Sequence, residues 1–226
     1  MTSYIFAPPA ASVAQIAGDE RVFPIRRILC VGRNYAAHAR EMGGDDRDPP
    51  FFFCKPADAI VAPGADVPYP GVTNDLHHEI ELVAALKSGG SDIPVDEALS
   101  HVFGYAVGVD LTRRDLQNAA KAARQPWDAS KGFDASAPMS AIKPWSGPAP
   151  QGRIHISVNG QVRQDAVVTD MIWNMAEIIA EASKLWRLAP GDLIFTGTPE
   201  GVGALARGDK VEGGVEGVGE LSFKVV

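Results

Sequence analysis

The stretch that decides the fold is His77-His78-Glu79-Ile80-Glu81-Leu82-Val83-Ala84-Ala85-Leu86. On a strand, Glu79 and Glu81 point to one face, while Ile80 and Leu82 point to the other. Taken alone, such a carboxylate pair most often marks a solvated strand face. The apolar continuation to Leu86 instead indicates a strand that runs into the core. Two partly buried carboxylates repel each other unless a cation lies between them.

The rest of the sequence predicts further short strands around this one. The 23 glycines and 17 prolines are spread along the chain, which is typical of strands joined by turns. Asn159-Gly160 is a type I′ hairpin signal because both central residues of that turn need positive φ. Glu212, Glu216 and Glu220, spaced among glycines, predict a twisted hairpin. The candidate strands are Arg27–Gly32, Phe51–Lys55, Glu79–Leu86, Phe103–Asp110, Arg153–Val158, Gln161–Asp165, Asp192–Thr196 and Leu221–Val226.

Helical patterns are fewer. Met171–Leu188 carries apolar residues at nearly a 3.6-residue period, and Thr169 or Asp170 is placed to cap it. Shorter helices are predicted at Arg113–Arg124 and at Tyr35–Met42. Strands and helices do not alternate strictly, which disfavours a doubly wound parallel sheet. The sequence therefore predicts a single α+β, mainly β, domain.

Composition narrows the range of partners. The chain has 28 acidic and 21 basic residues among 226, a net charge of −7, which argues against nucleic acid or an anionic membrane as partner. Met1–Gly18 has no basic residue to start a signal peptide, and Pro8-Pro9 breaks its apolar run. We therefore expect a cytoplasmic protein without a membrane span. Cys30 and Cys54 form no metal-binding or disulfide pattern, and both are predicted to be buried packing residues.

Asp110 is the third carboxylate of interest because it ends the apolar strand Phe103–Asp110 and precedes a predicted helix. A helix N-cap or a simple turn is the alternative interpretation. Together with Glu79 and Glu81 it makes an oxygen-only set, which suits Mg²⁺ or Mn²⁺ better than zinc. An octahedral ion held by three protein oxygens leaves room for a chelating substrate.

Other candidates are weaker when taken singly. His38 and Glu41 lie three apart and share a face if the segment is helical, so the glutamate could raise the basicity of the histidine, although such a pair is common on surfaces. Lys131 lies among aromatic and small residues and is either a partly desolvated anion contact or a surface lysine. Arg114 and Gln117 share one face of the helix after Asp110. The glycine-rich loop Thr196–Gly203 has no phosphate-binding signature.

The residue identities and the order of these motifs resemble those of the fumarylacetoacetate hydrolase superfamily, in its single-domain branch of acylpyruvate hydrolases. The resemblance covers about residues 25–226. It rests on Val31-Gly32-Arg33-Asn34-Tyr35 with His38 and Glu41, Phe53-Cys54-Lys55-Pro56, His77–Leu82, Gly104-Tyr105 to Asp110, Thr112, Arg114-Asp115, Gln117, Pro126-Trp127, Lys131, Val158-Asn159-Gly160 and Thr196–Gly203.

The resemblance implies a mixed β-sandwich roll that forms a homodimer, with residues 1–24 as an N-terminal extension and 25–226 as the catalytic domain. It implies one Mg²⁺ or Mn²⁺ per subunit and a small anionic 2-oxo acid as substrate. The implied roles are metal ligation by Glu79, Glu81 and Asp110, catalysis by His38, Glu41 and Lys131, and substrate binding by Arg33, Arg114, Gln117 and Thr198.

Substrate choice stays open within the family. Three segments resemble the fumarylpyruvate hydrolases of bacterial gentisate breakdown most, namely Phe51–Ala59, Leu111–Gln117 and Lys131–Pro138. The alternatives are a broader acylpyruvase or an oxaloacetate decarboxylase, and more remotely a non-catalytic metal-binding module. For a distal substrate carboxylate, Arg33, Arg40, Arg113 and Arg124 are all candidates.

Overall fold

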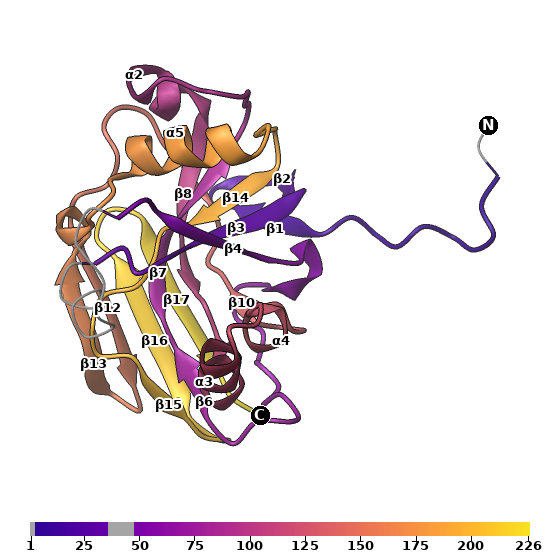
Figure 1. Ribbon diagram of the computed structural model, residues 1–226, viewed down its shortest axis with the longest axis vertical. Helices are drawn as coiled ribbons and strands as arrows, with labels where there is room; N and C mark the ends of the chain where they lie inside the picture. The colour runs from indigo at the N-terminus through magenta and orange to yellow at the C-terminus, as the bar shows by residue number, and fades with distance from the viewer. Residues whose placement is uncertain (1–2, 36–47) are drawn as a thin grey trace.

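The computed structural model describes residues 3–35 and 48–226. Its centre is a six-stranded sheet, drawn in Figure 1, in which only β14 and β3 run parallel. β7 crosses the middle of the molecule and all of its residues are buried, as the apolar run after Glu79 predicts. In sheet order the strands are β11 (Lys143–Pro144), β8 (Val102–Val109), β7 (Ile80–Leu86), β14 (Asp192–Phe195), β3 (Arg27–Gly32) and β4 (Phe51–Lys55).

A four-stranded antiparallel sheet packs on one face of this centre. Its order is β13 (Gln161–Val167), β12 (Arg153–Val158), β16 (Lys210–Val215) and β17 (Gly219–Lys224). Asn159 and Gly160 join β12 to β13 with φ of 52° and 77°, which confirms the hairpin signal. β16 and β17 form the second predicted hairpin.

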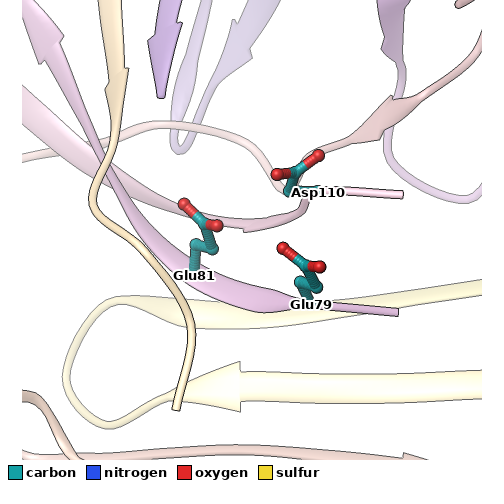
Figure 2. A group of neighbouring side chains, drawn as sticks. All are labelled: Glu79, Glu81 and Asp110. Carbon is teal, nitrogen blue, oxygen red and sulfur yellow. The ribbon is translucent and has the colours of Figure 1, made fainter. Parts of the chain in front are cut away.

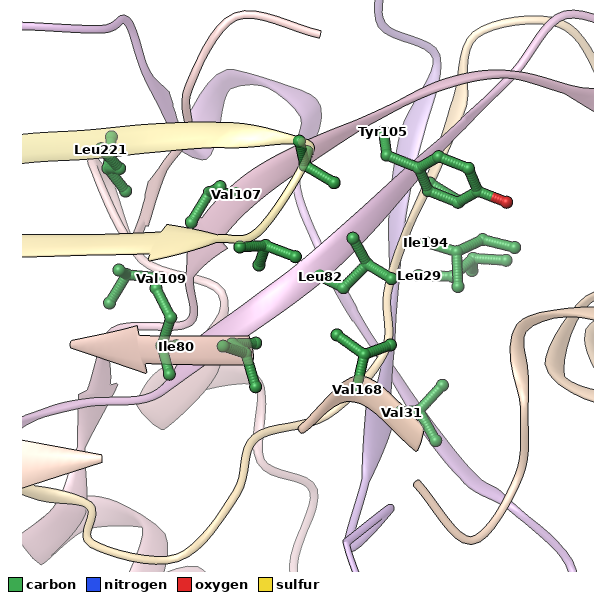
Figure 3. Close-up of a cluster of buried hydrophobic side chains, with 14 of the residues drawn as sticks. Leu29, Val31, Ile80, Leu82, Tyr105, Val107, Val109, Val168, Ile194 and Leu221 are labelled. Carbon is green, nitrogen blue, oxygen red and sulfur yellow. The ribbon is translucent and has the colours of Figure 1, made fainter. Parts of the chain in front are cut away.

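The core lies between the two sheets. Figure 3 shows Ile80 and Leu82 of β7 among side chains from β3, β8, β14 and β17, and most of this cluster is fully buried. The opposite face of the central sheet carries a second apolar cluster. That cluster includes Val83 and Ala85 of β7 together with the N-terminal hairpin of β1 (Val13–Ile16) and β2 (Asp19–Pro24). β7 is therefore covered on both faces.

Short elements complete the fold. Two small sheets are formed by β15 (Gly203–Leu205), β6 (Leu76–His78) and β9 (Thr112–Arg113), and by β10 (Ala137–Pro138) with β5 (Ile60–Val61). In the described ranges the helices are α2 (Val95–Ala98), α3 (Arg114–Ala123), α4 (Asp128–Lys131) and α5 (Met175–Leu185), with 3-10 turns η1 (Ala57–Ala59), η2 (Leu99–His101) and η3 (Val168–Asp170). Among the described residues, no helix is long and apolar enough to cross a membrane.

The prediction of a mainly β, α+β sandwich is confirmed. Two local predictions are wrong. The helix predicted at Met171–Leu188 begins at Met175, because the Asn174 side chain accepts hydrogen bonds from the first turn and the Glu177 carboxylate accepts one from the Asn174 backbone N–H. Thr169 and Asp170 instead lie in η3. Cys54 is exposed, because it lies on β4, which is an edge strand, and lines a surface hollow there. The predicted helix Tyr35–Met42 lies almost wholly outside the described residues.

Candidate metal and substrate site

Antiparallel pairing of β7 with β8 brings three carboxylates together. Ile80 pairs with Val109, so Glu79 at the start of β7 lies beside Asp110 at the end of β8, and the Asp110 amide donates to the Glu79 carbonyl at 2.8 Å. Glu81 shares the face of Glu79. Figure 2 shows the three carboxylates turned toward one another, and one ligand oxygen from each lies within 4.8 Å of the others.

These carboxylates are removed from water. Glu79, Glu81 and Asp110 are only 6%, 1% and 0% exposed. Burial raises the pKa of Glu81 well above its ordinary value, and the negative charges of Asp110 and Glu79 raise it further; a bond from the Gly197 amide at 2.8 Å acts in the opposite direction. A nearby positive charge therefore stabilises the ionised form of these carboxylates. The oxygen-only donors and their spacing fit a hard divalent cation such as Mg²⁺ or Mn²⁺.

Three buried or half-buried cations already surround the carboxylates. Lys131 Nζ lies 2.5 Å from Asp110 Oδ2 and 2.8 Å from Glu79 Oε2, and Arg114 donates to Glu79. Lys55 Nζ lies 2.8 Å from Asp110 Oδ1. Burial opposes the charge of Lys131, but Asp110 and Glu79 outweigh it and raise the pKa of its ammonium group. With all carboxylates ionised, the side chains balance in charge, so a bound divalent cation would leave the site positive.

A cavity of about 20 Å³ opens beside this cluster, which is room for a water molecule or an ion. The N-terminal end of α3 contributes Arg114 and Gln117, the end of α4 contributes Lys131, and the loop after β14 contributes Thr198. The cavity is lined by Val31, Gly32, Arg33, Phe53, Glu79, Glu81, Arg114, Gln117, Trp127, Lys131 and Thr198.

The structure therefore brings most of the predicted site residues to one place. Arg33, Thr198 and the residues of α3 line the same cavity as Lys131, while Asp110 lies behind it and contacts the lysine. His38 and Glu41 fall outside the described residues, as does Arg40. Arg113 lies elsewhere: its guanidinium is 4.3 Å from the centroid of the Phe133 ring and donates to the Ala129 carbonyl.

Lys55 is a site residue that the sequence reasoning missed. Its side chain is fully buried, and besides Asp110 it contacts the carbonyl oxygens of Leu111 and Lys131. It thereby ties the β4 strand to one carboxylate of the cluster and to the backbone of the nearby lysine. A lysine that ends an apolar strand was the available signal, but the strand pattern alone does not say which face it occupies.

Gln164 is a second missed residue. From β13 its amide nitrogen donates to Thr198 Oγ1 at 2.8 Å and to the Pro199 carbonyl at 2.7 Å, and its oxygen accepts from the Ile80 amide at 3.1 Å. Gln164 is buried and links the loop after β14 to the strand that carries the glutamates. No motif in the sequence marks it.

The sequence matches the profile of the fumarylacetoacetate (FAA) hydrolase C-terminal family over residues 27–226. The chain belongs to the fumarylacetoacetate hydrolase family. The predictions of this family and of an enzyme within it are confirmed.

Individual relatives agree with the family assignment. The chain is 46% identical over 176 residues to a fumarylpyruvate hydrolase of Ralstonia sp, covering 77% of this chain and 92% of the relative. It is 41% identical over 202 residues to a mitochondrial oxaloacetate tautomerase of Rattus norvegicus, covering 88% and 91%. A crystal structure of fumarylpyruvate hydrolase from Pseudomonas aeruginosa in complex with Mn²⁺ and pyruvate superposes with a TM-score of 0.95 at 50% identity, covering 99% of both chains.

Proposed function

We propose that this protein is a metal-dependent hydrolase that cleaves the carbon–carbon bond of 3-fumarylpyruvate to give fumarate and pyruvate, as in gentisate-type aromatic degradation. The observation that carries the proposal is the buried carboxylate cluster of Glu79, Glu81 and Asp110, which opens onto a cavity lined by Lys131 and Arg114. The 50% identical relative from Pseudomonas aeruginosa, in complex with Mn²⁺ and pyruvate, supports both the metal and the three-carbon product.

Glu79, Glu81 and Asp110 would hold one Mg²⁺ or Mn²⁺ ion. When bound, the ion would supply Lewis-acid polarisation of the 2-oxo group and charge for the oxygens of the substrate. The three carboxylates, when ionised, and the three cations that contact them balance in charge, so the added cation would leave two positive charges in this cluster. That excess suits a substrate with two carboxylates, although the protein as a whole is negative.

The protein's own residues would then carry the hydrolysis. His38, made more basic by Glu41, would take a proton from water, whose oxygen adds to the carbonyl carbon of the fumaryl group. The bond from that carbon to the pyruvate methylene breaks, its electron pair leaves with pyruvate as the enolate, and a proton completes pyruvate. Lys131 would stabilise the enolate oxygen electrostatically, since its ammonium group is already fixed beside the cluster.

Arg114, Gln117 and Thr198 would orient the 2-oxo acid, and Arg33 would contact the substrate from the end of β3. Gln117 is 2% exposed and accepts a hydrogen bond from Arg114, so these two side chains hold each other in place. Thr198 is held by Gln164 at 2.8 Å. Ordered side chains of this kind reduce the entropy lost when the substrate is positioned.

A second candidate is a broader acylpyruvase or an enzyme acting on oxaloacetate, including its decarboxylation. The 41% identity of the chain to the oxaloacetate tautomerase of Rattus norvegicus supports this second candidate. Such an enzyme needs the same metal and enolate stabilisation, but not the attack of water on a second carbonyl. A non-catalytic metal-binding module would be expected to have lost a ligand or the His38–Glu41 pair, and the sequence retains them all.

The experiment is an assay of purified protein against fumaryl-, maleyl- and acetylpyruvate and oxaloacetate, with and without Mg²⁺ or Mn²⁺, with products identified by NMR. We expect metal-dependent formation of fumarate and pyruvate from fumarylpyruvate. His38→Ala should abolish hydrolysis and largely spare any decarboxylation. Turnover of oxaloacetate alone would overturn the proposal.

We also propose that residues 25–226 form the catalytic domain, with residues 1–24 as an extension packed on it, that the protein is a cytoplasmic homodimer, and that neither nucleic acid nor membrane is a partner. Hydrogen bonds from Ala17 to Ile142 and from Ile25 to Ser12 support the packing of the extension.

A further inference from the structure

Two histidines precede the strand that carries the glutamates, and their side chains face opposite ways. Both lie on β6, which packs against α3 (Figure 1), and neighbouring residues of a strand point to opposite faces. His78 contacts Gln164 through Nδ1 at 3.0 Å. His77 instead contacts Arg114, the first residue of α3. His77 is not among the residues that line the cavity, so any effect it has on the site passes through Arg114.

The Arg114 guanidinium is held on three sides. Its Nε lies 3.4 Å from Nδ1 of His77, one terminal nitrogen donates to the Gln117 amide oxygen, and the other donates to the Glu79 carboxylate. A guanidinium has five N–H groups, so among the described residues these contacts leave one N–H on each terminal nitrogen for a further acceptor. Arg114 lines the cavity, where a substrate carboxylate can be that acceptor.

The contacts of His77 determine its tautomer. An arginine N–H only donates, so Nδ1 of His77 must accept and carries no proton. Nε2 then carries the ring proton and donates it to Asp75 Oδ1 at 2.8 Å. The negative charge of Asp75 polarises the ring and makes Nδ1 a stronger acceptor. The three side chains therefore form a chain of hydrogen bonds that runs from a carboxylate to the guanidinium.

The backbone around this chain of hydrogen bonds is fixed as well. The Arg114 amide donates to the Asp75 carbonyl at 2.8 Å, which ties the start of α3 to the segment before β6. His77 pairs with Thr112 of β9 on one side and with Ala204 of β15 on the other. Its side chain is only 17% exposed, so water competes little for its contact with Arg114.

We propose that Asp75 and His77 are a positioning pair for Arg114. The Asp75 carboxylate holds His77 in the tautomer that accepts from Arg114 Nε, and His77 holds the guanidinium in place at the cavity. A free arginine side chain loses much rotamer entropy when it binds a ligand, and an ordered one loses less. The proposal rests on the proposed function only in taking Arg114 as a contact of the 2-oxo acid.

The binding test uses oxalate, an unreactive dianion that resembles the enolate of pyruvate, and calorimetry on the Mn²⁺-loaded protein. His77→Leu keeps a side chain of similar size and removes both ring nitrogens. It should raise the Kd of oxalate about fivefold, as expected for the loss of one hydrogen bond. His77→Asn should recover most of the affinity, because its side-chain oxygen can take the place of Nδ1.

A double variant separates positioning from a general loss of structure. Arg114→Met should weaken oxalate binding more than His77→Leu does. Adding His77→Leu to Arg114→Met should change the Kd by less than about twofold, because the side chain that His77 positions is already gone. Additive losses, full affinity in His77→Leu, or no oxalate binding by the wild-type protein would overturn the proposal.

His101→Leu is the matched control for His77→Leu. His101 is also partly buried and bonds a neighbouring side chain, Ser88, at 2.8 Å, but it does not line the cavity. The control should leave the Kd of oxalate unchanged. A loss equal to that of His77→Leu would mean that removal of any partly buried histidine weakens binding, and would refute positioning.

Nitrogen-15 NMR of the Mg²⁺-loaded protein reads the tautomer directly. The His77 signals are those of the five histidines that disappear in His77→Leu. Long-range proton–nitrogen spectra should show the ring protonated at Nε2. Asp75→Ala should lower the population of that tautomer and raise the Kd of oxalate by a smaller factor than His77→Leu does. Protonation at Nδ1 in the wild-type protein, or an unchanged tautomer in Asp75→Ala, would overturn the pairing.

Turnover tests the proposed function separately. With fumarylpyruvate as substrate, His77→Leu should raise KM and leave kcat within about twofold, because Arg114 binds a part of the substrate that does not react. Absence of turnover by the wild-type protein overturns the proposed function, yet the nitrogen spectra and the oxalate comparison still decide whether the pair positions Arg114.

Discussion

Replacement of Lys55 by methionine tests whether the buried charges of the site depend on one another. Methionine keeps a long, unbranched side chain, so the change removes the ammonium group with little change of volume. Lys55 and Asp110 have no exposed side-chain surface. The variant therefore leaves Asp110 Oδ1 without its nearest cation, and the carbonyl of Leu111 without the donor that lies 3.1 Å away.

The magnitude follows from burial. Removing one partner of a buried ion pair costs about 3–5 kcal/mol. Asp110 keeps a second cation, since Lys131 Nζ lies 2.5 Å from Oδ2, so we expect the lower end, about 3 kcal/mol. Against a total stability of about 5–15 kcal/mol for a typical domain, the loss is large but leaves a folded protein to measure.

The assay is urea unfolding in chelator-treated buffer, followed by far-UV circular dichroism. The double variant Lys55→Met with Asp110→Asn should be more stable than the sum of the single changes indicates, by about 2 kcal/mol, because the neutral amide no longer needs the ammonium group. Lys184→Met, which removes an exposed ion pair, serves as control and should cost less than about 1 kcal/mol.

Two results would refute the reasoning. A loss below about 1 kcal/mol for Lys55→Met would mean that Lys131 alone neutralises Asp110. Strict additivity in the double variant would mean that Lys55 acts through packing and its carbonyl contacts rather than through charge.

Three further changes probe the site. Glu79→Ala should abolish both the heat of Mn²⁺ binding and turnover, and activity in metal-stripped buffer would contradict the proposed function. Gly197→Ala should destabilise the fold by at least about 2 kcal/mol in urea unfolding, because its Cβ would lie 2.8 Å from a neighbouring side chain at φ of 93°. Gly208→Ala, at φ of 92° with nothing within 4 Å, should cost about 1 kcal/mol, so equal losses would disprove the clash. Gln164→Ala should raise KM at unchanged kcat because Thr198 loses its support; a fall in kcat alone would contradict this.

Local sequence patterns predicted the regular elements well wherever burial dominates. The strands Arg27–Gly32, Phe51–Lys55 and Arg153–Val158 occur with the predicted bounds, because alternating or continuous apolar runs report burial directly. The start of α5 was predicted too early, since several residues offer a plausible cap and only the backbone course selects Asn174. Cys54 shows the same limit: strand pattern does not say that β4 lies at an edge.

The residues of the candidate site also divide into those that the sequence pattern predicts and those that only strand pairing brings in. Glu79 and Glu81 are neighbours on one strand, so their shared face follows from the two-residue period alone. Asp110 joins them only because β8 pairs antiparallel with β7 in the register that sets Ile80 against Val109. A shift of that register by one residue would turn the strand's side chains to the other face.

The sequence by itself determined the family, the main strands and an oxygen-only set of ligands, because these depend on residue type, spacing and order. Only the tertiary structure showed that Lys55 and Gln164 support the site. The physical reason is that each lies on a different element from the groups it contacts, and strand pairing and packing between distant segments decide which side chains share a buried volume.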